Sequence, residues 1–229
     1  MISMLLADSE LELVPREIVG YPAVRLNARR RNKSPAKSLL DASLHHSAMR
    51  SLPMGDRRGR PDIVHIFLLV ALESVLNRMG QLRVCIHTRN NEMITIDPTT
   101  RIPKNYPRFV GLMESLFEAG SVPEREPLIV MQRGRDIGAC IREIPHEKVI
   151  LLSPRGRMVR LSDYVRGCDG ALFILGGFPK GEFISDVSSE ADETISIYGE
   201  SLPVWTVASE ILVNYENHVL ERSEQSGIK

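Results

Sequence analysis

Short apolar stretches alternate with amphipathic segments along the chain, and this pattern predicts its elements. Apolar or alternating stretches predict strands at residues 2–7, 82–88, 93–98, 128–132, 148–153, 171–176 and 194–198. Apolar residues spaced three or four apart predict helices at residues 44–52, 63–77, 109–120, 136–143, 161–166 and 204–222. Short apolar strands separated by helices indicate an α/β fold with a parallel sheet covered on both faces.

The helix expected at residues 63–77 is apolar on nearly all sides, so we expect it to be deeply buried. Pro61 suits its first turn, where a missing N–H costs nothing, and Gly80 ends it. The Asn90-Asn91 pair predicts a hairpin turn between the two strands that follow.

The N-terminal part of the chain gives weaker signals. Residues Glu10 to Val14 predict a helical turn stopped by Pro15. Residues 25–38 are polar and basic without periodicity, which predicts a loop or an extended arm, and Leu39-Leu40 predicts a strand end.

Composition narrows the class of protein. Acidic residues follow the short apolar start of the chain, so it does not resemble a signal peptide, and the apolar run at residues 63–72 is too short to span a bilayer. We therefore expect a soluble, intracellular, cytoplasmic protein. The three widely spaced cysteines, Cys85, Cys140 and Cys168, favour buried reduced thiols over a zinc site or disulfides.

The net charge is zero, but the charges are unevenly distributed. Residues 25–60 hold ten Lys and Arg against two Asp and Glu, whereas residues 181–229 hold two against ten. This asymmetry indicates a basic face for an anionic partner, and a solvated charged surface is the alternative.

Two glycine-containing loops follow predicted strands, in ALFILGGFPKGEF and in YGESLPVW. Ligands bind beyond the carboxyl ends of strands in open α/β sheets, but a pair of glycines such as Gly176-Gly177 more often forms a tight turn than a cofactor site. The loops match neither a Rossmann fingerprint nor a P-loop. The histidines lack HExxH spacing and the serines lack a GxSxG context, so neither a metal site nor a serine hydrolase is indicated.

Two basic motifs are candidates for contact with nucleic acid. RRGRPD at residues 57–62 crowds three arginines around Asp62 at the start of a predicted helix. In TRIPKNYPRF, three cations surround Asn105 and Tyr106, a composition that suits phosphate contact and base stacking. A solvated loop is the alternative for the second motif.

These motifs resemble one known family. The strings RPDI, LN-x-x-G-x-L-x-V-x-IHT and TRIP-x-x-x-x-RF-x-GLM are similar to those of the nucleolar essential protein family, SPOUT-class methyltransferases of small-subunit ribosomal RNA. The likeness is dense over residues 38–119 and thinner through FILGGF and the C-terminal helix. The absence of the long N-terminal extension of eukaryotic members favours an archaeal-type member.

The resemblance implies a fold and its organisation. We expect one SPOUT domain over residues 1–229, with a doubly wound, mostly parallel sheet, a C-terminal trefoil knot and a basic extension. RNA-binding basic segments would lie within about residues 25–110, and the knotted cofactor-binding part within about residues 128–222.

It also implies a reaction and partners. The family product is N1-methylpseudouridine in a hairpin loop of small-subunit RNA, S-adenosyl-L-methionine is the cofactor, and the enzyme is a homodimer. Some members also assist ribosome assembly apart from methylation, so assembly proteins are candidate partners. The implied cofactor contacts are Leu175, Gly176, Gly177, Phe178, Gly181, Ile197, Tyr198, Gly199, Leu202, Val204 and Ala208.

The implied catalytic residues are Arg60 and Asp62, beside the target base. An ordinary aspartate, with a pKa of about 3.9, is a weak base at neutral pH, so we expect Asp62 to orient the base rather than to deprotonate it. The alternative is an ion pair that only fixes the start of the helix. The implied RNA contacts are Arg57, Arg58, Arg60, Arg101, Lys104 and Arg108.

Two other functions fit the same sequence. One is a non-catalytic RNA-binding assembly factor that keeps the fold, because backbone atoms bind the cofactor and many side chains would permit it. The other is a SPOUT enzyme with another substrate, such as tRNA, against which the RRGRPD and TRIP segments argue only by resemblance.

Overall fold

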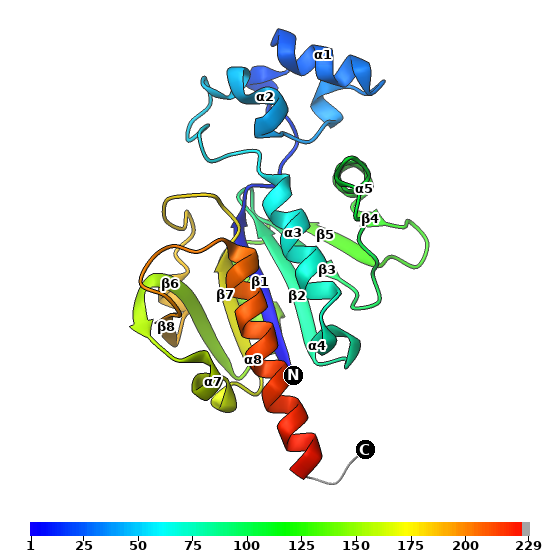
Figure 1. The fold of residues 1–229 in the computed structure, drawn as a ribbon. Coiled ribbons are helices and arrows are strands. Elements are labelled where there is room, and N and C mark those ends of the chain that lie inside the picture. Colours follow the sequence, from blue (N-terminus) through cyan, green and yellow to red (C-terminus); the bar gives the residue numbers. More distant parts are fainter. Residues whose placement is uncertain (226–229) are drawn as a thin grey trace.

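The computed structural model describes residues 1–225, and a mixed sheet runs through the centre of this part of the chain (Figure 1). Its strand order is β4-β5-β3-β2-β1-β7-β6-β8. The strands are β1 (Ile2–Ser9), β2 (Leu82–Thr88), β3 (Glu92–Ile96), β4 (Ser121–Val122), β5 (Ile129–Arg133), β6 (Lys148–Met158), β7 (Ala171–Gly176) and β8 (Glu193–Ser196). The strands from β2 through β1, β7 and β6 to β8 are parallel to their neighbours, and β3, β4 and β5 form an antiparallel edge.

Helices cover both faces of this sheet and one end of the molecule. They are α1 (Pro22–Arg30), α2 (Ala42–Met49), α3 (Pro61–Leu72), α4 (Val75–Arg78), α5 (Tyr106–Ala119), α6 (Ile137–Glu143), α7 (Leu161–Tyr164) and α8 (Val204–Gln225). Short 3-10 turns lie at Arg16–Ile18, Pro35–Lys37, Val165–Gly167 and Ser188–Glu190. A mostly parallel sheet covered on both faces is the arrangement that the hydrophobic pattern predicted.

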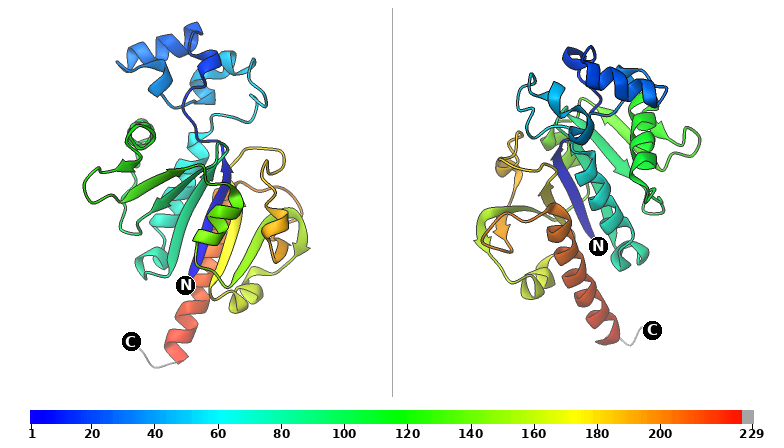
Figure 2. Two further views of the ribbon diagram at one scale, coloured as in Figure 1. Left: turned by 180° about the vertical axis from the view of Figure 1, so that it is seen from behind. Right: turned by 45° about the horizontal axis from the view of Figure 1, so that its top comes forward.

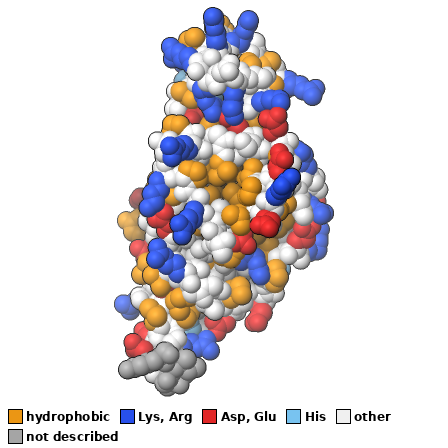
Figure 3. Space-filling view, turned by 90° about the vertical axis from the view of Figure 1, so that its right-hand side faces the viewer, with side chains coloured by type: hydrophobic (Ala, Val, Ile, Leu, Met, Phe, Trp, Pro, Cys, Tyr) orange, Lys and Arg blue, Asp and Glu red, His pale blue; other side chains and the backbone are white. Residues whose placement is uncertain are grey.

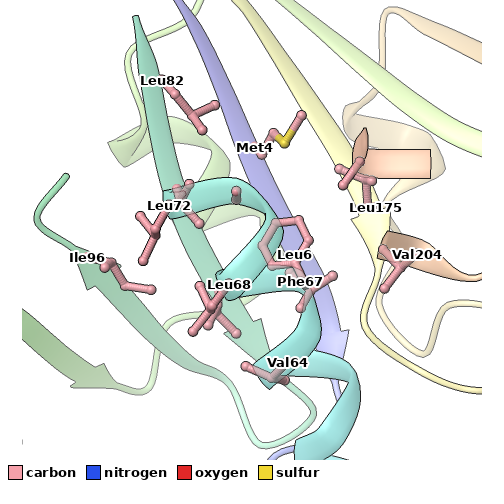
Figure 4. Close-up of a cluster of buried hydrophobic side chains, with 14 of the residues drawn as sticks. Met4, Leu6, Val64, Phe67, Leu68, Leu72, Leu82, Ile96, Leu175 and Val204 are labelled. Atoms are coloured by element: carbon pink, nitrogen blue, oxygen red, sulfur yellow. The ribbon is translucent and has the colours of Figure 1, made fainter. Parts of the chain in front are cut away.

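The central strand β1 is buried on both faces. Met4 and Leu6 belong to a cluster with α3, α5 and α8, whereas Leu5 and Ala7 belong to a second cluster with α6. Figure 4 shows Met4 and Leu6 beside Phe67 of α3, and Figure 2 (left) shows α6 on the opposite side of the sheet. Side chains alternate between the faces of a strand, so β1 supplies both halves of the core.

The helix predicted at residues 63–77 is two helices. Pro61 occupies the first turn of α3, as expected, but α3 ends at Leu72. Ser74 then begins α4, because its hydroxyl accepts a hydrogen bond from the Asn77 amide at 3.1 Å, as N-cap residues do. The expectation that this helix is deeply buried was also wrong in part, since Leu69 and Val70 are only half-buried.

Two predictions near the N-terminus were wrong. The segment at residues 10–14 is extended, because the Val14 amide donates to Ser38 and Leu13 forms an antiparallel bridge with Leu39. The arm expected at residues 25–38 begins as helix α1, which buries only Val24 and Ala28 against a small cluster with α2. Two apolar positions four residues apart gave too weak a periodic signal to predict a helix.

Three smaller expectations are confirmed. Asn91 adopts the left-handed conformation in the turn between β2 and β3, and the Asn91 amide donates to Thr88. The three cysteines are buried and unpaired. No helix within residues 1–225 is long and apolar enough to cross a membrane.

A buried carboxylate connects the α1–α2 extension to the rest of the molecule. Glu114 of α5 is 2% exposed and accepts hydrogen bonds from the Arg31 guanidinium at 2.6 and 2.7 Å, from Lys33, and from the Leu39 amide. Burial raises the pKa of Glu114, but these hydrogen bonds outweigh burial and lower it.

Replacing Glu114 by alanine should therefore destabilise the protein. Arg31 and Lys33 would lose a buried acceptor, and breaking such a pair costs about 3 kcal/mol when the cations are partly exposed. Urea unfolding monitored by circular dichroism measures this loss. The matched control is Glu118→Ala, whose exposed pair with Lys37 should contribute little to stability. Equal effects of the two substitutions would contradict this role for Glu114.

Candidate functional site

A cavity of about 490 Å³ lies at the carboxyl ends of the parallel strands β6, β7 and β8. Three chain segments form most of its wall: residues 152–154, 175–183 and 195–207. Arg60 and Ile63, from the start of α3, complete it. The volume suits a small organic ligand, and the position is the one where ligands bind in open α/β sheets.

The loop after β7 is attached closely to the end of β1. The Gly177 amide donates to Ala7 at 2.7 Å, and the Glu10 amide donates to the Gly177 carbonyl at 3.1 Å. A Cβ at Gly177 would lie 2.3 Å from Ser9 Oγ and 2.7 Å from Ser9 Cα, so only glycine allows this approach.

Asp8 holds the far end of the same loop. Its carboxylate accepts hydrogen bonds from the Ile184 amide at 2.6 Å and from the Ser185 amide and hydroxyl at 3.0 and 2.7 Å. Asp8 is buried and has a φ of 50°, a conformation that costs free energy in a residue other than glycine. Burial raises the pKa of Asp8, but the neighbouring His87 ring and the hydrogen bonds from this loop outweigh it and lower the pKa to about 2.

Arg60 and Asp62 form the ion pair expected of the RPD motif. The guanidinium donates to the two carboxylate oxygens at 2.9 and 2.8 Å, and both side chains remain partly exposed. The hydrogen bond to Asp62 is the main reason that the pKa of Arg60 is raised. Because Arg60 also lines the cavity, the pair lies at its edge.

Two contacts hold the TRIPKNYPRF segment against α3, which begins in this motif, and against the start of α2. His65 of α3 lies 2.8 Å from the Pro103 carbonyl and stacks on Phe109. The Tyr106 hydroxyl donates to Asp41 at 2.6 Å, and burial together with this bond raises the pKa of Tyr106. The two candidate RNA motifs, separated in sequence, are therefore held together.

The predicted RNA contacts divide into exposed and buried residues. Arg101, Lys104 and Arg108 are exposed, and Lys104 makes only a surface contact with Glu73 at 3.3 Å. The guanidinium groups of Arg57 and Arg58 instead point into the protein, where Glu10 and Glu12 accept from them at 2.6 and 2.8 Å. Their side chains are 8% and 11% exposed, which argues against phosphate contacts by these two arginines.

The strong basic run at residues 25–60 is also largely neutralised. Glu114 pairs with Arg31 and Lys33, and Glu118 pairs with Lys37. Glu10 and Glu12 pair with Arg57 and Arg58. Exposed arginines that remain in this run are Arg25, Arg29, Arg30 and Arg50. Figure 3 shows blue side chains gathered at the end of the molecule that α1 and α2 form.

Comparison with known proteins identifies the family. The sequence profile of the EMG1/NEP1 methyltransferase family matches residues 4–216. The chain belongs to this family. It is 91% identical, over 99% of its length and all of the relative's, to the "Ribosomal RNA small subunit methyltransferase Nep1" of Methanothrix thermoacetophila. It is 47% identical, over 96% of its length and all of the relative's, to the protein of the same name from Thermococcus onnurineus.

A solved structure of the family supports the same assignment. The crystal structure of Archaeoglobus fulgidus Nep1 bound to S-adenosylhomocysteine matches with a TM-score of 0.81 at 37% identity, over 95% of this chain and 98% of that one. The resemblance inferred from the RPDI and TRIP strings is thereby confirmed.

Most of the residues that this EMG1/NEP1 resemblance implied for the cofactor line the cavity. These are Leu175, Gly176, Phe178, Gly181, Ile197, Tyr198, Leu202 and Val204. Gly177 lies instead against Ser9, and Ala208 is fully buried in the core beneath. Gly199 follows the lining residue Tyr198 directly.

Sequence reasoning missed several functional neighbours. Ser153, Ser196 and Trp205 line the cavity, and Asp8 and Arg89 hold its surroundings. A polar residue at the carboxyl end of a buried strand was the available signal for Asp8 and Ser196. Arg89 had no local signal, because its partner Glu10 is far away in the sequence.

Replacing Asp8 by asparagine should remove part of the acid sensitivity of folding. A carboxyl whose pKa is lowered on folding stabilises the protein above its unfolded pKa and loses this effect as the pH falls through its folded pKa. Asp8 should therefore contribute roughly 2 kcal/mol at pH 7, lost between about pH 4 and pH 2. Urea unfolding at a series of pH values measures it, with the exposed Asp163→Asn as control. If the free energy of unfolding of Asp8→Asn fell between pH 4 and pH 2 as steeply as that of the unmodified protein, this assignment would be contradicted.

Proposed function

We propose that the chain methylates small-subunit ribosomal RNA at N1 of a pseudouridine in a hairpin loop. One observation carries the proposal: Arg60 both lines the cavity and forks the Asp62 carboxylate. This double role of Arg60 supports a small-molecule site directly beside Asp62, the residue that the family resemblance assigns to the target base. The protein would act in the cytoplasm, during assembly of the small subunit.

The cavity has the features that S-adenosyl-L-methionine requires. Aromatic and aliphatic side chains such as Phe178, Leu175 and Trp205 form apolar walls, and Ser153 and Ser196 add hydroxyl groups. The close approach at Gly177 fixes the loop after β7 to the end of β1, beside the cavity. Leu175, Gly176, Phe178, Gly181, Ile197, Tyr198, Leu202 and Val204 would hold the cofactor, which supplies a methyl group on a positively charged sulfur.

The chain's own contribution is to position the base. N1 of pseudouridine carries a hydrogen, so Asp62 can accept a hydrogen bond from it and fix the orientation of the ring. This hydrogen leaves N1 as a proton to solvent when the methyl group arrives. Arg60 restrains the carboxylate through both oxygens, which limits the conformations of the pair. Holding two reacting groups in line supplies several kcal/mol of a reaction barrier.

The exposed cations of the TRIPKNYPRF segment would bind the RNA backbone. Arg101, Lys104 and Arg108 surround the loop that is held by His65 of α3 and by Asp41 at the start of α2. A base in a hairpin loop is flipped out of its stack at lower cost than a base in a duplex. We do not include Arg57 and Arg58 in this surface, because their guanidinium groups are buried.

We also propose that the C-terminal part, within about residues 128–222, is threaded as a trefoil knot in one domain. Leu152 and Arg157 of β6 both pair with Ile195 of β8, so residues 153–156 bulge out of the ladder between these strands. A Cβ at Gly156 would lie 2.5 Å from the Ile195 carbonyl carbon, so the bulge packs closely on β8. The family resemblance carries the proposal of a knot. Pulling both termini in an optical trap should leave the unfolded chain shorter than an unknotted one.

A homodimer is the oligomeric state that we propose. Val75 of α4, Met79 directly after it, and Val213 and Leu220 of the neighbouring helix α8 are exposed apolar side chains. A face of this kind is typical of subunit contacts. A mass of one chain in sedimentation equilibrium would refute the dimer.

Methyl transfer to defined RNA hairpins tests the proposed reaction. We expect labelled methyl groups to enter a hairpin with pseudouridine in its loop. The matched hairpin with uridine should bind comparably and accept none, because uridine has carbon at the corresponding ring position. If both cofactor and RNA bind but no methyl is transferred, the protein is an assembly factor. Transfer to tRNA alone would indicate a different substrate.

Replacing Asp62 by asparagine should reduce methyl transfer by about 10²-fold, because the amide keeps only one acceptor oxygen and loses the ion pair with Arg60 that fixes it. Binding of S-adenosylhomocysteine should change little. The control is Asp56→Asn in the same segment, whose pair with Lys180 is exposed. Turnover of Asp62→Asn at the rate of the unmodified protein, with intact folding, would mean that the pair only fixes the start of α3.

A further inference from the structure

Arg57 connects the RRGRPD segment to the wall of the cavity. Its side chain is buried and its Nε donates to Glu10 Oε1 at 2.6 Å. Its Nη1 donates to the Glu182 carbonyl at 2.7 Å, and its guanidinium carbon lies 4.2 Å from the centre of the Phe178 ring. One side chain therefore makes three contacts, two of them with the loop that follows β7.

The residues that Arg57 contacts are the ones that enclose the cavity. Phe178 and Glu182 both line it, together with Phe183. Phe178 and Phe183 pack edge to face, with 5.1 Å between ring centres. The position of the Phe178 ring thus determines that of Phe183, and Arg57 holds the first of the two.

The remainder of the loop depends on this contact. Gly177 is fixed by β1, and Ile184 and Ser185 are fixed by Asp8, so both ends are held. Between them, Lys180 pairs with Asp56, and Glu182 with Arg155, at the exposed surface. Exposed pairs contribute little to the position of a loop.

We propose that Arg57 is a positioning residue for the methyl-donor site. It orders residues 178–183 as a wall of the cavity, and so acts through Phe178 and Glu182 rather than through RNA. The inference rests on the proposed function, which assigns this cavity to the donor. It also means that the segment carrying Arg60 and Asp62 holds the donor wall.

A guanidinium is needed for this role. It is planar, so it can stack on the Phe178 ring while its edge donates to Glu10 and to the Glu182 carbonyl. Lysine keeps the charge beside Glu10 but cannot make all three contacts. Arg57→Lys is therefore the informative substitution, because it leaves the buried carboxylate a cation.

Calorimetry with S-adenosylhomocysteine tests the inference. We expect Arg57→Lys to weaken binding about tenfold, the loss of one charge-assisted contact. Arg31→Lys is the matched control, because it loses a similar bidentate pair with Glu114 away from the cavity and should leave this affinity within about twofold. In steady-state kinetics, KM for the donor should rise with kcat and KM for RNA retained. A purely structural defect would instead lower kcat through the fraction of active protein.

Phe178, the residue that Arg57 stacks on, provides a second and independent substitution. Phe178→Leu removes the ring, and combining it with Arg57→Lys should weaken binding by less than the product of the two single effects. Unchanged affinity in Arg57→Lys, or a rise in KM for RNA alone, would overturn the inference. If the unmodified protein fails to bind S-adenosylhomocysteine, the assignment of the cavity fails instead.

Discussion

The structure around the site depends on one buried carboxylate, that of Glu10. It is inaccessible to solvent and accepts from Arg57 and from Arg89, each at 2.6 Å. Its backbone carbonyl accepts from the Arg60 amide at 2.9 Å, and its amide donates to the Gly177 carbonyl. The end of β1 thus joins the RRGRPD segment, the end of β2 and the loop after β7. Burying a carboxylate costs free energy unless charged donors surround it, so these segments must come together for Glu10 to be buried.

This requirement explains why charge along the sequence was a poor guide to where exposed basic side chains lie. The basic run at residues 25–60 predicted a face for an anionic partner, but the acids that neutralise much of it are Glu10, Glu12 and Glu114, outside the run. A count of charges within one stretch of sequence cannot include the partners that folding brings in from other stretches. In the TRIPKNYPRF segment, by contrast, the cations are exposed, so the expectation of a basic surface agrees with their positions.

The sequence predicted most of the sheet because its strands are apolar on both faces, as β1 and β7 are. It did not predict the extended course of residues 10–14, because the hydrogen bonds that hold this segment join it to Ser38 and Leu40, which lie more than twenty positions away. The family resemblance assigned Leu175, Gly176 and Phe178 to the cofactor, and these residues line the cavity. Asp8 and Arg57 were not assigned their roles, because a hydrogen bond to a loop residue more than a hundred positions away leaves no local pattern.

The ion pairs around Glu10 have a physical reason. Replacing a buried ion pair by packed apolar residues often leaves stability unchanged or raises it, so stability alone does not explain Arg57, Arg89 and Glu10. Apolar residues pack in many arrangements, whereas a guanidinium satisfies its donors only in a few. A site in which a small donor and a base must meet within ångströms needs a single arrangement of its walls. A displaced loop would take the Glu182 carbonyl away from the buried guanidinium of Arg57, so the network favours one position of the loop.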